Sequence, residues 1–206
     1  MSSSKSTFQL RNARRNPLHG FEVSRPVAIS LLVAGCASNA FTPPDLPVAL
    51  RPPQNQSAFL EARARGVQIY ECAAKSDEPS GFAWTFKAPE ATLTDRSGRS
   101  IGKHYGGPTW QSIDGSAVVG EVAARDPGPD PSAIPWLFLT AKTTSGAGDF
   151  GGVKSIQRVH TAGGVAPSQP CSSSNVKQIA RVPYTATYYF YRTTILIEYA
   201  LDRSSI

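Results

Sequence analysis

Most of the chain after residue 66 alternates between apolar and polar positions with a period of two, the spacing typical of β-strands. Asp114-Gly115 is a strong two-residue hairpin signal, and three prolines exclude residues 126–131 from a strand ladder. Strands are predicted over residues 67–72, 82–86, 91–94, 100–105, 110–113, 116–122, 134–142, 153–160 and 182–191. The pattern predicts an all-β, mainly antiparallel fold: a sandwich or barrel of about eight strands.

One segment before these strands has a different pattern. Ser57 precedes the run from Ala58 to Arg65, which contains several good helix formers, and Gly66 follows it. A hydroxyl residue at the start and a glycine at the end are typical helix boundaries. We therefore expect one short N-terminal helix here, in a single β domain over residues 57–192 followed by a tail over 193–206.

An apolar run from Pro26 to Gly35 ends at Cys36. The run is far shorter than the roughly 18–20 residues that span a bilayer, and it has the length of a signal-peptide core. Its end, Val33-Ala34-Gly35-Cys36, resembles the bacterial lipobox, in which the cysteine carries lipid and begins the mature protein. We interpret residues 1–35 as a signal peptide and residues 36–56, with five prolines, as a lipidated, extended tether. Secretion without lipid and a buried apolar segment are the alternatives.

The distribution of charge along the chain argues against a nucleic-acid partner. The chain has a net charge of +6, but residues 1–35 alone carry +4, with five basic residues and one acidic residue. After Cys36 the basic residues are scattered, so the clustered charge that neutralises phosphates is absent and nucleic-acid binding is not expected. The membrane is an expected partner through the lipid anchor only, with the protein in the periplasm, on the outer membrane or secreted.

The chain has three cysteines: Cys36, Cys72 and Cys171. If Cys36 carries lipid, the other two form an even pair, and in an oxidising compartment such a pair indicates a disulfide. Two buried free thiols are the alternative. No metal site is expected, because neither cysteine has a partner at Cys-x-x-Cys spacing.

His104 is the leading candidate for chemistry. It lies in the sequence His104-Tyr105-Gly106-Gly107-Pro108-Thr109-Trp110, where two glycines permit an unusual backbone path and the aromatic residues suit a pocket wall. Asp114 and Asp130 are weak catalytic candidates as partners of His104, and Asp126 is a third carboxylate of this kind. Each aspartate also has a sufficient explanation as a turn former.

Aromatic side chains provide a second set of candidates. Tyr105, Trp110 and Trp136 are candidate binding residues, because such rings stack on sugars or aromatic ligands; in a β domain they are also common core residues. His160 is expected on one strand face with Ile156 and Arg158. No Gly-x-Ser-x-Gly or Gly-x-Gly-x-x-Gly motif is present, so neither a serine nucleophile nor a dinucleotide cofactor is expected, and no other cofactor is indicated.

Several blocks in order resemble a family of exported proteins, domain-of-unknown-function family 3455. They include Gly66-Val67-Gln68-Ile69-Tyr70-Glu71-Cys72, Trp84-Thr85-Phe86-Lys87-Ala88-Pro89-Glu90-Ala91, the His104–Trp110 block, Asp130–Leu137, Ile156-Gln157-Arg158, Gly163–Pro167 and Val182-Pro183-Tyr184. The resemblance runs from about Leu46 to Arg192 and implies an exported domain without an established activity.

These observations favour a cell-envelope lipoprotein whose β domain is a binding or structural module for a small molecule, a glycan or an envelope protein. The alternative is a hydrolase-like enzyme that uses His104 with a nearby carboxylate. A hydrogen bond from His104 to one of the three aspartates would favour the enzyme.

Overall fold

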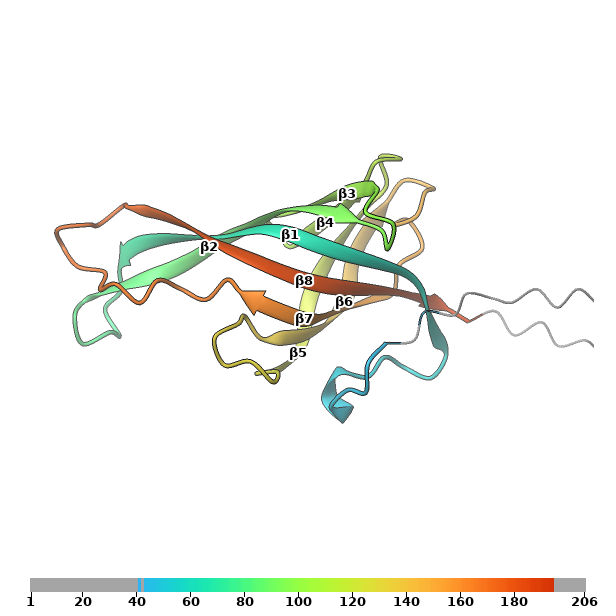
Figure 1. The fold of residues 1–206 in the computed structure, drawn as a ribbon, viewed down its shortest axis with the longest axis horizontal. Helices are drawn as coiled ribbons and strands as arrows, with labels where there is room; N and C mark the ends of the chain where they lie inside the picture. The colour runs from blue at the N-terminus through green and yellow to red at the C-terminus, as the bar shows by residue number, and fades with distance from the viewer. Residues whose placement is uncertain (1–40, 42, 195–206) are drawn as a thin grey trace, which may run out of the picture. The chain divides into compact units, whose positions relative to one another are not determined.

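The computed structural model describes Phe41 and residues 43–194, and these form an eight-stranded antiparallel sheet closed into a barrel (Figure 1). Consecutive strands are neighbours, and β8 closes the barrel by pairing with β1. The strands are β1 (Gln56–Ala74), β2 (Phe82–Thr94), β3 (Ser100–Tyr105), β4 (Thr109–Ser112), β5 (Ala117–Asp126), β6 (Trp136–Ser145), β7 (Ser155–Gly163) and β8 (Ile179–Thr193). The all-β, antiparallel prediction is confirmed, in its barrel form.

The predicted helix over residues 58–65 is wrong. This segment is the first half of β1, whose Arg63 pairs with Thr94 of β2 on one side and Thr187 of β8 on the other. Pairing with two strands outweighs the segment's modest helix propensity. Gly66 does not end a helix; it permits close strand packing, because a Cβ there would overlap the Glu90 carbonyl oxygen. The only helix among the described residues is a 3-10 turn, η1 (Val48–Leu50).

Two predicted strands, 82–86 and 91–94, are one continuous strand, β2. Pro89 lies between them and pairs only with Gln68 of β1, since pairing of β2 with β3 begins at Ala91. A proline is tolerated where one edge of the strand has no partner. The ends of β1, β2 and β8 therefore project beyond the shorter strands as an arm (Figure 1).

The disulfide between Cys72 and Cys171 ties this arm together and confirms the predicted pairing. Cys72 lies near the end of β1, and Cys171 lies in the connection between β7 and β8. Both are buried. The bond therefore fixes a long connection against the end of the arm.

The barrel has a closed end, at the turns that follow β2, β4 and β6. Phe150, from the β6–β7 connection, is fully buried there and packs on Phe190 of β8 with ring centroids 4.6 Å apart. Asp114 joins two turns of this end: it accepts hydrogen bonds from the Ser116 hydroxyl at 2.6 Å and the Asp149 N–H at 2.8 Å. These bonds lower the pKa of Asp114 to about 2, the Ser116 hydroxyl contributing most.

A second apolar cluster lies on the outer face of the barrel. Leu46 and Leu50, from the segment before β1, pack there with Trp136, Phe138 and Val159 among others. The described part of the expected tether, residues 43–53, therefore lies against the barrel instead of extending away from it. The signal peptide, Cys36 and residues 195–206 of the tail lie outside the described residues.

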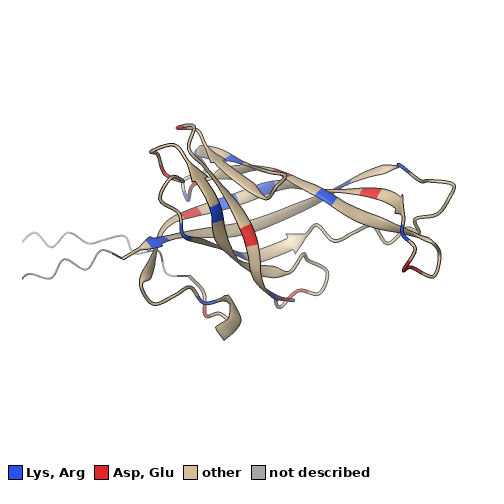
Figure 2. Cartoon of the chain, turned by 180° about the vertical axis from the view of Figure 1, so that it is seen from behind, with Lys and Arg blue, Asp and Glu red and all other residues tan. Residues whose placement is uncertain are grey.

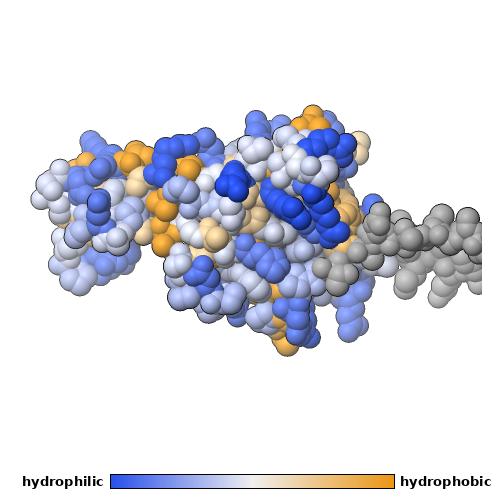
Figure 3. Space-filling view, in the orientation of Figure 1, coloured by the Kyte–Doolittle hydropathy of each residue, from blue (hydrophilic) through white to orange (hydrophobic). Residues whose placement is uncertain are grey.

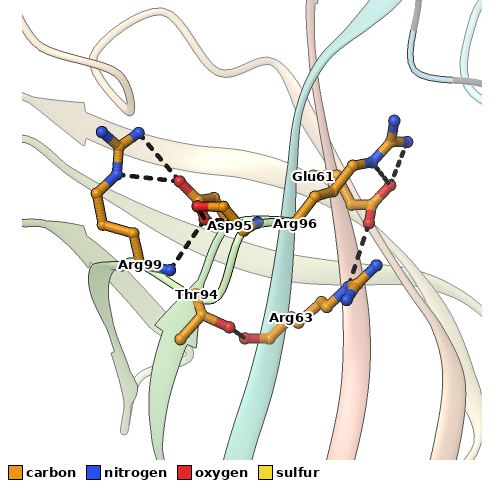
Figure 4. A network of polar contacts seen from close by, with 7 residues as sticks. Glu61, Arg63, Thr94, Asp95, Arg96 and Arg99 are labelled. Carbon is orange, nitrogen blue, oxygen red and sulfur yellow. Dashed lines mark hydrogen bonds and ion pairs between the residues drawn. The ribbon is translucent and has the colours of Figure 1, made fainter.

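A buried carboxylate on the same outer face holds the β2–β3 turn (Figure 4). Glu61 of β1 is 6% exposed and accepts two hydrogen bonds from Arg96, at 2.8 and 2.5 Å, with Arg63 at 3.6 Å. Burial by itself would raise the pKa of Glu61, but the hydrogen bonds and charge of Arg96, aided by Arg63, outweigh it and the pKa is lowered. Asp95, which is partly buried, and the exposed Arg99 form a separate pair within the turn.

Charged residues of both signs are interspersed over the strands in Figure 2, with no large face of one sign in that view. No helix in the described part of the chain combines the length and apolar character required to cross a membrane.

Candidate functional site

A cavity of about 430 Å³ lies inside the barrel, at the end opposite the closed end that Phe150 fills. Its lining residues come from all eight strands. Its floor is buried and includes His104, Trp110, Leu139 and Tyr188. Exposed residues, among them Phe86, line its mouth near the base of the arm. On the face shown in Figure 3, apolar residues gather where the arm meets the barrel. Eight-stranded barrels are either filled by side chains or wide enough for one small ligand. This barrel is filled by side chains at the Phe150 end and has a cavity at the other.

The shape of the floor follows from small residues on β1. Ala62 and Ala64 are buried and face inward, and Gly66 follows with the same alternation. Small side chains on one wall leave room for the large rings of Trp110 and Tyr188, whose centroids are 5.3 Å apart. The run that resembles a helix in the sequence therefore supplies small core residues beside these rings, while β1 lines the cavity itself with Gln68 and Tyr70.

His104 is 3% exposed and stacks on Trp110 with centroids 4.3 Å apart. Its Nδ1 lies 2.9 Å from the Thr109 carbonyl oxygen. A carbonyl only accepts hydrogen bonds, so Nδ1 carries the proton and Nε2 is left as an acceptor. Burial lowers the pKa of His104 to about 3, despite the opposing Thr109 bond, and Arg158 lowers it further. At neutral pH this imidazole is uncharged.

Four buried polar side-chain atoms have no hydrogen-bond partner among the described residues: Gln68 Nε2, Trp110 Nε1, Tyr184 Oη and Tyr188 Oη. Three of these residues, Gln68, Trp110 and Tyr188, line the cavity. Burial raises the pKa of Tyr184 and Tyr188, so both hydroxyls keep their protons and can donate. Unpartnered buried groups are costly and uncommon in folded proteins, and here all four are donors.

Arg158 is a partly buried, positively charged residue in the lining of the cavity. It is the cross-strand partner of Tyr188, so both side chains face inward. Its Nε and Nη2 donate to the Pro135 carbonyl oxygen at 3.1 and 2.8 Å. Among the described residues no carboxylate lies within 4.0 Å of the guanidinium, and no Asp or Glu lines the cavity.

The predicted carboxylate partners of His104 are not beside it. Asp114 lies at the closed end of the barrel, where it bridges two turns. Asp130 and Asp126 lie in the β5–β6 loop and bind their own backbone: Asp130 accepts from Ser132 N–H and Asp126 from Gly128 N–H. Asp126 and Asp130 therefore act as turn formers, whereas Asp114 forms its own turn and also joins it to the β6–β7 connection. No described carboxylate hydrogen-bonds to His104.

The three aromatic residues predicted as binding candidates lie in different parts of the structure. Trp110 is 1% exposed and lines the cavity, whereas Trp136 faces outward into the second apolar cluster. Tyr105 is 36% exposed and lies against Lys103 outside the cavity. His160 does not share a face with Arg158, because the strand bulges after Val159 and His160 has a φ of +50°. Its ring contacts Trp136 on the outside.

Two polar residues of the cavity lining, Arg158 and Gln68, were not among the site residues predicted from the sequence. One signal was present, since an arginine that alternates with Ile156 on β7 indicates a charge on an apolar face. The partners of that arginine come from other strands, which the alternation does not reveal. No group of three or more His, Cys, Asp or Glu in the described part of the chain is arranged to hold a metal ion.

A family model described as "Protein of unknown function (DUF3455)" matches residues 52–192, which span the whole barrel. No curated protein matches the chain, and no solved structure does.

Proposed function

The chain belongs to the DUF3455 family, and from that premise we propose that its barrel binds one small molecule with an apolar body and hydrogen-bond acceptors. The observation that carries this proposal is the cavity: apolar walls enclose buried donors without partners. Pockets for small ligands commonly combine mostly apolar walls with a few well-placed polar groups. A ligand that accepts hydrogen bonds would satisfy donors that the protein leaves unpaired.

A second part of the proposal is anchoring through lipid at Cys36, which the lipobox-like sequence Val33-Ala34-Gly35-Cys36 supports. Phe41 lies against Arg96 at the closed end of the barrel, with the guanidinium 4.8 Å from the ring centroid. Phe41 therefore lies at the end of the barrel opposite the cavity mouth. The disulfide fits the oxidising compartment to which a lipoprotein is exported.

1-Octanol, an apolar chain with a single hydroxyl, is the probe that tests the cavity. We expect calorimetry to show one site with a Kd below about 0.5 mM, which corresponds to about 0.5 kcal/mol per non-hydrogen atom of the probe. Val122→Trp places an indole in the cavity and should weaken binding at least about tenfold, since 1.4 kcal/mol of lost contact suffices.

Ala123→Trp is the matched control. Ala123 is the exposed neighbour of Val122, at the bulge of β5, and is not part of the cavity lining, so the same bulk is added at a solvent-exposed position. This variant should bind 1-octanol as the unmodified protein does. Absence of binding by the unmodified protein, or equal binding by the two variants, would contradict the proposal.

A further inference from the structure

We infer that the ligand is a carboxylate, a monoanionic organic acid whose headgroup pairs with Arg158 inside the barrel. This inference rests on the proposed function and adds the charge and geometry of the headgroup. It starts from the guanidinium, which is the charged group with unused donors inside an otherwise apolar, donor-lined cavity.

The hydrogen bonds of Arg158 leave one edge of its fork free. Nε and Nη2 each give one N–H to the Pro135 carbonyl oxygen. A guanidinium has five N–H donors, so three remain after the bonds to Pro135, with the Tyr188 hydroxyl close enough to interact with them. These donors form the end-on edge, which matches the two oxygens of a carboxylate.

The rest of the cavity favours an anion over a neutral or cationic group. Its lining contains three cationic residues, Arg158, Arg125 and Lys87, and no acidic residue. Glu71 offsets Lys87 at 3.0 Å from outside the lining, whereas no described carboxylate pairs with either arginine. The neutral His104 adds no charge, and the hydroxyl of Tyr188, cross-strand from Arg158, is a further donor.

The same arrangement favours one negative charge over two. A phosphate monoester needs several cations or a cluster of backbone N–H groups. Of the three cationic residues in the lining, Arg158 alone is partly buried, since Lys87 and Arg125 are exposed at the mouth. Around the guanidinium the walls are apolar, with Ile134, Leu137 and Leu139. A planar, singly charged head on an apolar body fits this distribution.

Octanoate, 1-octanol and octyl phosphate share one alkyl chain and isolate the headgroup. At pH 7.5 we expect the protein to bind octanoate at least tenfold more tightly than 1-octanol and more tightly than octyl phosphate. Arg158→Gln should remove the preference for octanoate, so that the ratio of the 1-octanol Kd to the octanoate Kd falls from at least ten to about one. Arg158→Lys, which keeps the charge but lacks the fork, should show an intermediate preference and provides the test if the Gln variant does not fold.

Arg65→Gln is the matched control, because Arg65 is an exposed arginine on the outward face of β1 and should leave all three affinities unchanged. If 1-octanol binds but octanoate binds no better, or if octyl phosphate binds best, the carboxylate inference is overturned while the proposed binding function stands. Retention of the octanoate preference by both Arg158 variants overturns it as well. If no probe binds, the proposed function itself fails.

Discussion

His104 illustrates how burial decides the chemistry of a single residue. Its sequence neighbours, two glycines and two aromatic residues, suit a reactive histidine at the rim of a pocket. In the folded barrel the ring is stacked on Trp110, donates to the Thr109 carbonyl and is uncharged at neutral pH. The residue therefore forms part of the cavity wall, with Nε2 as an acceptor.

The lowered pKa of His104 makes stability depend on pH in a definite direction. The unfolded chain binds a proton near pH 6.5, but the folded protein does so only near pH 3. The contribution of this residue is therefore complete above pH 6.5 and is lost as the pH falls below that value, by up to about 1.4 kcal/mol per pH unit. Urea unfolding at pH 7 and pH 5 measures the loss.

His104→Gln should remove the pH dependence of the free energy of unfolding between pH 6.5 and 5. His160→Gln, at an exposed position, should retain that dependence. An imidazole of His104 that titrates near pH 6.5 in NMR spectra of the folded protein would contradict the assignment.

At the scale of the elements, the strands and their turns were largely predictable. Alternation located all the strands after residue 66, and β3 begins and ends at the predicted residues. Asp114-Gly115 forms the expected turn, with Gly115 at a φ of +87°. The errors have one cause: helix signals at Ser57 and Gly66, and the break at Pro89, are local preferences that pairing with a neighbouring strand overrides.

The Glu61–Arg96 contact gives a prediction at this scale, because it joins the β2–β3 turn to β1 (Figure 4). Glu61→Gln should lower the free energy of unfolding at pH 7 by about 1–3 kcal/mol, the usual range for a hydrogen bond to a buried charged group. Since the pKa of Glu61 is lowered, this contribution is complete above pH 4.5 and is lost as the pH falls through the folded value.

Glu90→Gln is the control for this change. Glu90 pairs with Arg181 at 2.9 Å, but both side chains are at least half exposed, and such pairs contribute less than about 1 kcal/mol. Equal losses for the two variants in urea unfolding would show that burial gives Glu61 no special role.

At the scale of the whole molecule, intact mass tests the proposed lipid anchor and the disulfide of the arm together. Protein from its own membranes should begin at a lipid-modified Cys36, with Cys72 and Cys171 labelled by alkylating reagents only after reduction. The bridge spans 99 residues, so its reduction should lower the free energy of unfolding by about 2–5 kcal/mol. An unprocessed chain with three free thiols would contradict both the anchor and the bridge.

The sequence by itself determined the all-β class, most strand and turn positions, the cysteine pair and the family, because alternation, turn residues and motif order are properties of neighbouring positions. Only the tertiary structure decided that the sheet closes and that residues 58–65 are a strand, since both depend on pairing between β1 and β8. It also decided the site: Arg158, Tyr188, His104 and Trp110 lie on four strands, and barrel closure brings them together around one cavity.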